Sequence, residues 1–186
     1  CRTDRVFMLT ILHESGVEIR KLHTGSFVFL ATSNSSIGVL HELKRVGLDM
    51  NIQQGGQTAL EFVAKRSPLT EERIRTAETL LELGVDLKAN AHGAFKTILK
   101  IKSPRALPLI SIMLRHGADP NIRTYGEPVL IYFAEQNDIP KVELLLQYKA
   151  KVDLTDRSGE TAFMNAVDKN FLELAQLLFE SGADIN

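Results

Sequence analysis

The chain has 186 residues, of which 44% are hydrophobic and 24% are charged, and its formal net charge at pH 7 is −1. These values are typical of a folded protein and exclude a disordered one, and the longest apolar runs, such as residues 107–114, are shorter than the roughly 18 residues of a bilayer span. Cys1 is the only cysteine, which excludes an internal disulfide framework and a cysteine-based zinc site. No signal peptide opens the chain, so we expect a reducing setting, cytoplasmic or nuclear.

A short motif recurs along the chain. It consists of an apolar stripe, then glycine, a small or apolar residue, an acid and an apolar residue, often followed by asparagine. Its anchors lie at 16, 47, 84, 117, 149 and 182, with spacings of 31, 37, 33, 32 and 33 residues. Glycine at this place predicts a helix end, because it adopts the left-handed conformation without a Cβ penalty. Six such anchors indicate a repeat array.

A second motif follows most anchors nine or ten residues later. It reads GQTALEFVA at 56–64 and GETAFMNA at 159–166, with looser copies GSFVF at 25–29 and GEPVL at 126–130. At this spacing the chain resembles the ankyrin repeat family, whose repeat opens with G-x-T-P-L-H-x-A and closes with L-L-x-x-G-A-D-x-N. No repeat here keeps the T-P-L-H tetrapeptide, because Thr58 and Thr161 are followed by alanine and Pro128 stands where threonine is expected.

The resemblance implies an all-α fold, an ankyrin-repeat solenoid of stacked helix-turn-helix units with projecting hairpin loops and a concave binding surface. We expect one domain over 1–186, with a partial repeat at 1–20 whose outer helix spans 4–15, and repeats at approximately 21–51, 52–88, 89–121, 122–153 and 154–186. The start at Cys1 and the stop at Asn186, directly after a closing motif, suggest a fragment of a larger protein.

Three local departures from the repeat pattern carry structural expectations. The 37-residue interval predicts a longer loop around 67–70, ahead of a helix that starts near Glu71. Lys149 replaces the closing glycine, so that turn is expected to be strained or reshaped. Apolar side chains at Leu60, Leu130 and Phe163 are expected in the core.

The residue types of an active site are present without the spacing that catalysis or metal binding needs. The histidines at 13, 23, 41, 92 and 116 show no i,i+3 or i,i+4 pairing, and no phosphate loop or G-x-S-x-G motif occurs. Gly55-Gly56 is interpreted as a hairpin turn, and Glu71-Glu72 as acids that favour a helix start. We therefore expect no enzyme activity, no metal and no cofactor.

Charge is unevenly distributed along the chain. Residues 87–118 contain six bases and no acid, whereas residues 119–186 contain twelve acids and six bases. Lys96 and Lys100, four residues apart, share one helix face. If that helix is the inner one of its repeat, both ammonium groups could attract an acidic partner segment, and the alternative is a solvated face. Nucleic acid is a weaker candidate, since the basic stretch is short and lacks the interleaved aromatic residues on which bases stack.

The predicted function is a non-catalytic protein-protein interaction scaffold that binds a partner protein on its concave face and hairpin tips. The alternative is a regulatory or substrate-docking arm of a larger enzyme, kinase or ion channel. Tyr125 is the strongest anchor candidate, because tyrosine offers contact area at low entropic cost, and packing against the neighbouring hairpin is its structural alternative. The resemblance places the other candidates at hairpin tips and inner-helix faces: Gln54, Gln57, Lys65, Arg66, Lys96, Lys100, Thr124, Glu127, Glu135, Gln136, Arg157, Ser158, Glu160, Asp168 and Lys169.

Overall fold

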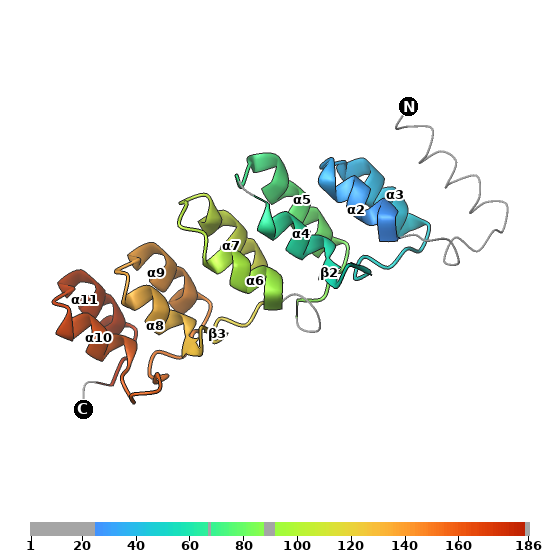
Figure 1. The fold of residues 1–186 in the computed structure, drawn as a ribbon. Helices are drawn as coiled ribbons and strands as arrows, with labels where there is room; N and C mark the ends of the chain where they lie inside the picture. The colour runs from blue at the N-terminus through green and yellow to red at the C-terminus, as the bar shows by residue number, and fades with distance from the viewer. Residues whose placement is uncertain (1–24, 67, 88–91, 185–186) are drawn as a thin grey trace. The chain divides into compact units, whose positions relative to one another are not determined.

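The computed structural model describes residues 25–66, 68–87 and 92–184 (Figure 1). The predicted partial repeat at 1–20 and its helix at 4–15 lie outside these residues. The chain divides into two compact units, Cys1–Gly117 (unit 1) and Ala118–Asn186 (unit 2), each of which is described by itself.

Unit 1 is made of helix pairs. The first helices of the pairs are α2 (Gly25–Ser33), α4 (Ala59–Lys65) and α6 (His92–Leu99), which we call inner helices, and they pack against one another in that order. The second, outer helices are α3 (Ile37–Arg45), α5 (Glu71–Glu82) and α7 (Ala106–Arg115), which also pack in order. Strands β1 (Gln53–Gln54) and β2 (Gln57–Thr58) form a hairpin ahead of α4. The predicted helix start near Glu71 is confirmed.

Unit 2 repeats the same plan. Its inner helices α8 (Val129–Ala134) and α10 (Ala162–Asp168) pack together, and each contacts its own outer helix, α9 (Ile139–Gln147) or α11 (Leu172–Glu180). The hairpin of β3 (Arg123–Thr124) and β4 (Glu127–Pro128) precedes α8. The described helices are connected by short turns, and the only strands among the described residues belong to the two hairpins, which confirms the all-α repeat fold.

The opening motif starts the inner helices α4 and α10 with threonine caps. Thr58 Oγ1 accepts a hydrogen bond from the backbone N–H of Glu61 at 3.2 Å, and Glu61 Oε2 accepts one from the Thr58 N–H at 3.1 Å. This reciprocal capping box satisfies two N–H groups that the first helical turn leaves without partners. Thr161 caps α10 with a single bond of this kind, because its side chain accepts from the Met164 N–H at 3.2 Å and methionine cannot return it.

The closing motif ends each outer helix with a left-handed residue. Gly84 and Gly117 have φ values of 91° and 92°, and Lys149 adopts the same conformation at 65°. The turn at Lys149 keeps the hydrogen bonds of the glycine turns, since Lys149 N–H donates to Leu146 O at 2.9 Å and Ala150 N–H donates to Leu145 O at 3.0 Å. The backbone is therefore strained there, as expected for a residue with a Cβ, and the turn is not reshaped.

The apolar core lies between the helices of each unit. Leu60 and Leu130 are buried as predicted, with exposed fractions of 1% and 2%. The expectation for Phe163 is wrong, because its side chain is only half-buried. It stands on α10 in the last described repeat of unit 2. No helix in the described part of the chain is both long and apolar enough to cross a bilayer.

Candidate functional site

The β3–β4 hairpin of unit 2 presents an aromatic side chain at its tip. Arg123 pairs with Pro128 and Thr124 with Glu127, so the tip consists of Tyr125 and Gly126. Both tip residues are left-handed, with φ values of 57° and 92°, which matches the twist of a tight two-residue hairpin. The Tyr125 side chain is 69% exposed. Its ring centroid lies 5.8 Å from that of Tyr132 on α8, so the ring packs on the helix of its own repeat.

Two arginine side chains lie against the tip of this hairpin. Arg123 Nη1 donates to the Gly126 carbonyl at 3.1 Å, and its Nη2 donates to the Thr155 carbonyl of the next loop at 3.4 Å. The guanidinium of Arg157 lies where a Cβ on Gly126 would be, so a larger residue would displace that side chain, and the φ of 92° itself favours glycine. The tip and the following loop are thus tied together before any partner arrives.

The corresponding loop of the last repeat has no strands, but a side chain fixes its turn. Asp156 Oδ1 accepts hydrogen bonds from the backbone N–H groups of Ser158 at 2.7 Å and Glu160 at 3.0 Å. In this Asx-type turn, the side chain supplies hydrogen bonds that the paired strands supply in a β-hairpin. Arg157, Ser158 and Glu160 are all exposed, as predicted for a tip.

In unit 1, the β1–β2 hairpin confirms the interpretation of Gly55-Gly56 as a turn. Both glycines are left-handed, with φ values of 61° and 74°, and Gln54 pairs with Gln57 beside them. Gln54 is exposed and Gln57 is half-buried. This tip offers amide groups but no large side chain.

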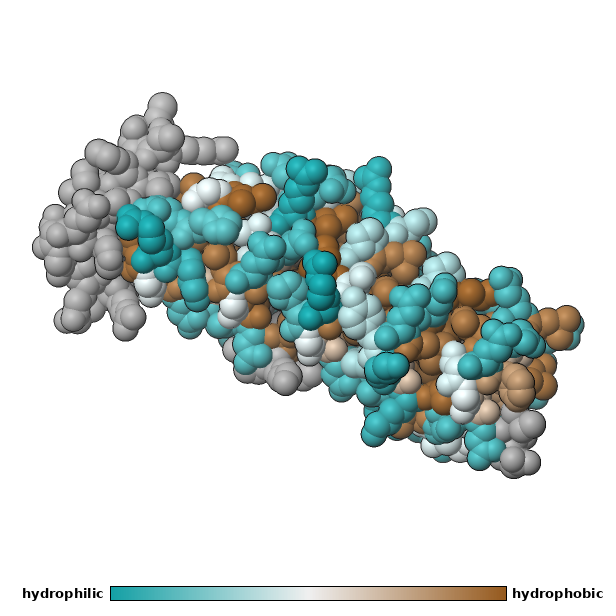
Figure 2. Space-filling view, turned by 180° about the vertical axis from the view of Figure 1, so that it is seen from behind, coloured by the Kyte–Doolittle hydropathy of each residue, from teal (hydrophilic) through white to brown (hydrophobic). Residues whose placement is uncertain are grey.

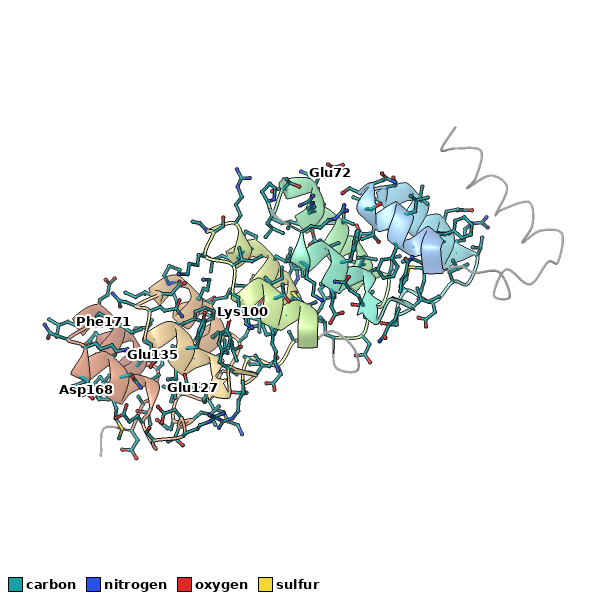
Figure 3. The ribbon with its side chains drawn as sticks, viewed as in Figure 1. Glu72, Lys100, Glu127, Glu135, Asp168 and Phe171 are labelled. Carbon is teal, nitrogen blue, oxygen red and sulfur yellow. The ribbon has the colours of Figure 1, made fainter. Side chains whose placement is uncertain are left out.

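The ends of the inner helices carry charged side chains. At the end of α4, the Arg66 guanidinium lies 4.5 Å from the Phe62 ring centroid. In unit 2, Lys169 Nζ donates to the Glu135 carbonyl at 3.4 Å and lies 3.9 Å from its Oε1. Glu135 and Asp168, at the ends of α8 and α10, are labelled in Figure 3. In unit 2, the exposed charges Glu135, Asp168 and Lys169 thus lie together at the ends of the neighbouring inner helices α8 and α10.

Thr124 is a wrong prediction among the candidate residues. Its exposed fraction is 1%, and its Oγ1 has no hydrogen-bond partner. Successive side chains of a strand point to opposite faces, so Arg123 points to solvent and Thr124 points inward toward α8. The tip motif predicted the hairpin correctly but not which of its residues face outward.

The other candidate residues divide by exposure. Gln57, Lys96 and Glu127 are half-buried. The exposed set is Gln54, Lys65, Arg66, Lys100, Tyr125, Glu135, Gln136, Arg157, Ser158, Glu160, Asp168 and Lys169. Helix α6 is an inner helix that packs on α4. Lys96 is one of its residues, and Lys100, labelled in Figure 3, follows its last residue.

Sequence reasoning missed a cavity of about 410 Å³ in unit 1. It lies where α4 ends and where α6 leads into α7, and Lys65, Arg66 and Arg105 line it together with aliphatic side chains. The only feature of the sequence that could have indicated this cavity is the acid-free stretch 87–118, to which Arg105 belongs. The approach of Arg105 to Lys65, forty positions earlier, follows from the stacking of α4 and α6.

A cation site does not arise from side chains in the described ranges, where no group of three or more His, Cys, Asp or Glu residues comes together. The structure presents two kinds of candidate binding surface. One consists of the hairpin tips and the exposed ends of the inner helices, and the other is the basic cavity of unit 1.

Comparison with known families matches residues 99–186 to the model "Ankyrin repeats (3 copies)". This chain is built of ankyrin repeats. The ankyrin-repeat chain is 31% identical over 168 residues to human "Ankyrin repeat and SOCS box protein 6", which covers 84% of this chain and 39% of that protein. It is 28% identical over 165 residues to "Palmitoyltransferase AKR1" of Lachancea kluyveri, covering 83% of this chain and 21% of the relative.

Among solved structures, the ankyrin-repeat chain is similar to the crystal structure of the ankyrin repeat protein EF0377. The TM-score is 0.63 at 22% identity, with 86% of this chain and 83% of the other covered, which shows a shared fold. The chain spans only about two fifths of the length of the human relative. Ankyrin repeats are generally protein-protein interaction modules and are typically not catalytic.

Proposed function

We propose that the chain is a non-catalytic scaffold that binds a partner protein through its hairpin tips and the exposed ends of its inner helices. The observation that carries this proposal is Tyr125, which is 69% exposed at a tip that Arg123 ties to the next loop by hydrogen bonds. A large exposed aromatic side chain on a fixed turn has little conformational entropy to lose, and tyrosine is enriched among the residues that dominate binding energy.

The distribution of charge supports the same proposal and indicates the charge of the partner. The acids at the unit 2 tips and inner-helix ends, such as Glu127, Glu160 and Asp168, would favour a partner with basic groups near an apolar patch that receives Tyr125. Complementary charges of this kind affect orientation and association rate more than final affinity. The single cysteine of the chain supports a cytoplasmic or nuclear setting for this binding.

The test is affinity capture from cell lysate followed by mass spectrometry, with three forms of the chain. The wild type is compared with Tyr125→Ala, and the control is Leu172→Ala, which removes a side chain that is 74% exposed on the outer helix α11. Partners that Tyr125→Ala loses and Leu172→Ala retains support the tip as the binding site. Partners retained equally by both variants contradict it.

A second candidate is a docking or regulatory arm of a larger enzyme, kinase or ion channel. It is favoured by the relative named as a palmitoyltransferase, of which this chain matches only 21%. Sequencing of the full transcript decides between the two. An adjoining catalytic or channel domain supports the docking arm, and further repeats alone support the scaffold.

A further inference from the structure

The basic cavity of unit 1 has two distinct parts, and none of its lining residues belongs to a described hairpin. Its floor includes Ala64, Leu69 and Ile101, of which the first two are 4% and 5% exposed. Its rim carries three cations, Lys65, Arg66 and Arg105, all exposed. The lining residues, all within the described part of the chain, include no acid.

The position of the Arg66 guanidinium is restrained by aromatic rings. It lies 4.5 Å from the centroid of Phe62, and Phe62 makes an edge contact with Phe29 of α2 at 5.7 Å between centroids. A cation over a ring gains electrostatic attraction and loses some of its rotational freedom. One rim charge is thus held in place on an aromatic ring.

A neutralising partner for these cations is missing from the lining itself. Arg105 belongs to residues 87–118, which hold six bases and no acid. Basic side chains near a helix end also interact favourably with the helix dipole, which explains Lys65 at the end of α4. The dipole does not account for Arg105, which precedes the first residue of α7 and makes no side-chain cap. Like charges gathered there repel one another, and an anionic ligand would relieve that repulsion.

We propose that this cavity binds a protein segment in which one apolar side chain is flanked by Asp or Glu residues. The apolar side chain enters over Ala64, Leu69 and Ile101, and the flanking carboxylates meet Lys65, Arg66 and Arg105. A volume of about 410 Å³ accommodates one leucine-sized side chain with adjoining backbone. The inference deepens the proposed scaffold function and rests on it, since it names the chemistry of one bound segment.

A single-stranded nucleic acid fits this cavity less well. Binding of that kind uses aromatic side chains on which bases stack, along a groove that follows the backbone. The lining contains no aromatic residue, and its apolar floor is aliphatic. An apolar floor inside a ring of cations instead matches an acidic peptide with an apolar anchor.

The experiment measures fluorescence polarisation of the amidated peptide Asp-Glu-Asp-Leu-Glu-Asp-Glu with fluorescein on its N-terminus. The peptide is titrated with the wild-type chain, with Lys65→Glu/Arg105→Glu, and with Lys96→Glu/Lys100→Glu. Both double variants replace two unit 1 cations with two carboxylates, so they change the net charge equally, but only the first pair lines the cavity. Circular dichroism confirms that each variant keeps its helices.

We expect Lys65→Glu/Arg105→Glu to weaken binding by about tenfold or more, and Lys96→Glu/Lys100→Glu by less than about threefold, at roughly 0.15 M salt, where distant charges are screened. The peptide with serine in place of leucine should bind at least about fivefold more weakly, since the apolar contact is lost. The methyl resonances of Ile101 and Leu69 should shift on addition of the leucine peptide to the wild type.

Several results would overturn the proposal. These are no binding to the wild type, equal losses in both double variants, a larger loss in Lys96→Glu/Lys100→Glu, or equal affinity for the leucine and serine peptides. Tighter binding of an oligouridine that displaces the peptide would assign the cavity to nucleic acid instead. None of these measurements involves Tyr125. The cavity proposal can therefore be disproved while the hairpin-tip proposal stands. Likewise, the capture experiment with Tyr125→Ala can disprove the hairpin-tip proposal without testing the cavity.

Discussion

The side chain of Asn51 hydrogen-bonds to the backbone of the next repeat at Asp86. Asn51 Oδ1 accepts from the Asp86 N–H at 2.8 Å, and Asn51 Nδ2 donates to the Gly84 carbonyl at 3.3 Å. The same link recurs in unit 2, where Asn121 Oδ1 accepts from the Lys151 N–H and Asp153 Oδ1 accepts from the Asp184 N–H, at 2.8 and 2.9 Å. The Asn or Asp side chain that closes the motif therefore joins consecutive repeats by a hydrogen bond.

Replacing Asn51 with alanine should destabilise the chain by about 1–2 kcal/mol, because two hydrogen bonds to the backbone of the next repeat are lost. The free energy of unfolding, from urea denaturation followed by circular dichroism, measures this change. Gln54→Ala, at the exposed hairpin tip, is the control and should stay within about 0.5 kcal/mol of the wild type. Equal effects of the two variants would show that the link between repeats adds nothing.

Replacing Lys149 with glycine should stabilise the chain by about 0.5–1 kcal/mol. The residue has a φ of 65°, where a Cβ is strained, and the gain is reduced by the greater entropy of glycine in the unfolded chain. Thermal and urea unfolding both report it. Lys151→Gly is the matched control, since Lys151 is exposed and does not have a positive φ, and it should be neutral or destabilising. Stabilisation by both substitutions would argue against a specific effect of the turn.

Gly93 and Glu61 should be energetically coupled across the contact of α4 and α6. A Cβ on Gly93 would collide with the Glu61 carboxylate that completes the Thr58 capping box. We therefore expect Gly93→Ala to give little or no gain in the wild type, because Glu61 must move.

In a Glu61→Ala background, the same Gly93→Ala substitution should stabilise by up to about 1 kcal/mol, since alanine is the better helix former. A double-mutant cycle from urea denaturation yields the coupling energy. A Gly93→Ala effect that is identical in both backgrounds would mean that the two positions are independent.

Two leucines of α11 should differ sharply in their contribution to stability. Leu174 is fully buried, with an exposed fraction of 0%, whereas Leu172 is 74% exposed. Leu174→Ala should cost about 2–4 kcal/mol through lost burial and a residual cavity, and Leu172→Ala less than about 0.5 kcal/mol. Figure 2 shows hydrophobic side chains, in brown, among the hydrophilic ones on this face of the molecule. A large cost for Leu172→Ala would show that this exposed residue has a partner in solution.

The repeat period, the helix ends and the hairpin turns could be predicted from the sequence, because their causes are local. Gly84 and Gly117 end outer helices through their own φ preference, and Thr58 starts α4 with a bond to a residue three positions away. Lys149 shows the limit of this rule, since the surrounding turn keeps its geometry without glycine.

Exposure and long-range proximity were decided by packing between elements. Thr124 sits in a tip motif and yet faces α8, because strand alternation against a helix chooses the inward side chain. Lys65 and Arg105 line one cavity because α4 and α6 stack. No local sequence pattern predicts which side of each helix stays uncovered when the helices pack. A one-dimensional motif specifies backbone geometry within a repeat, whereas the surface that a partner meets is formed by side chains from several repeats together.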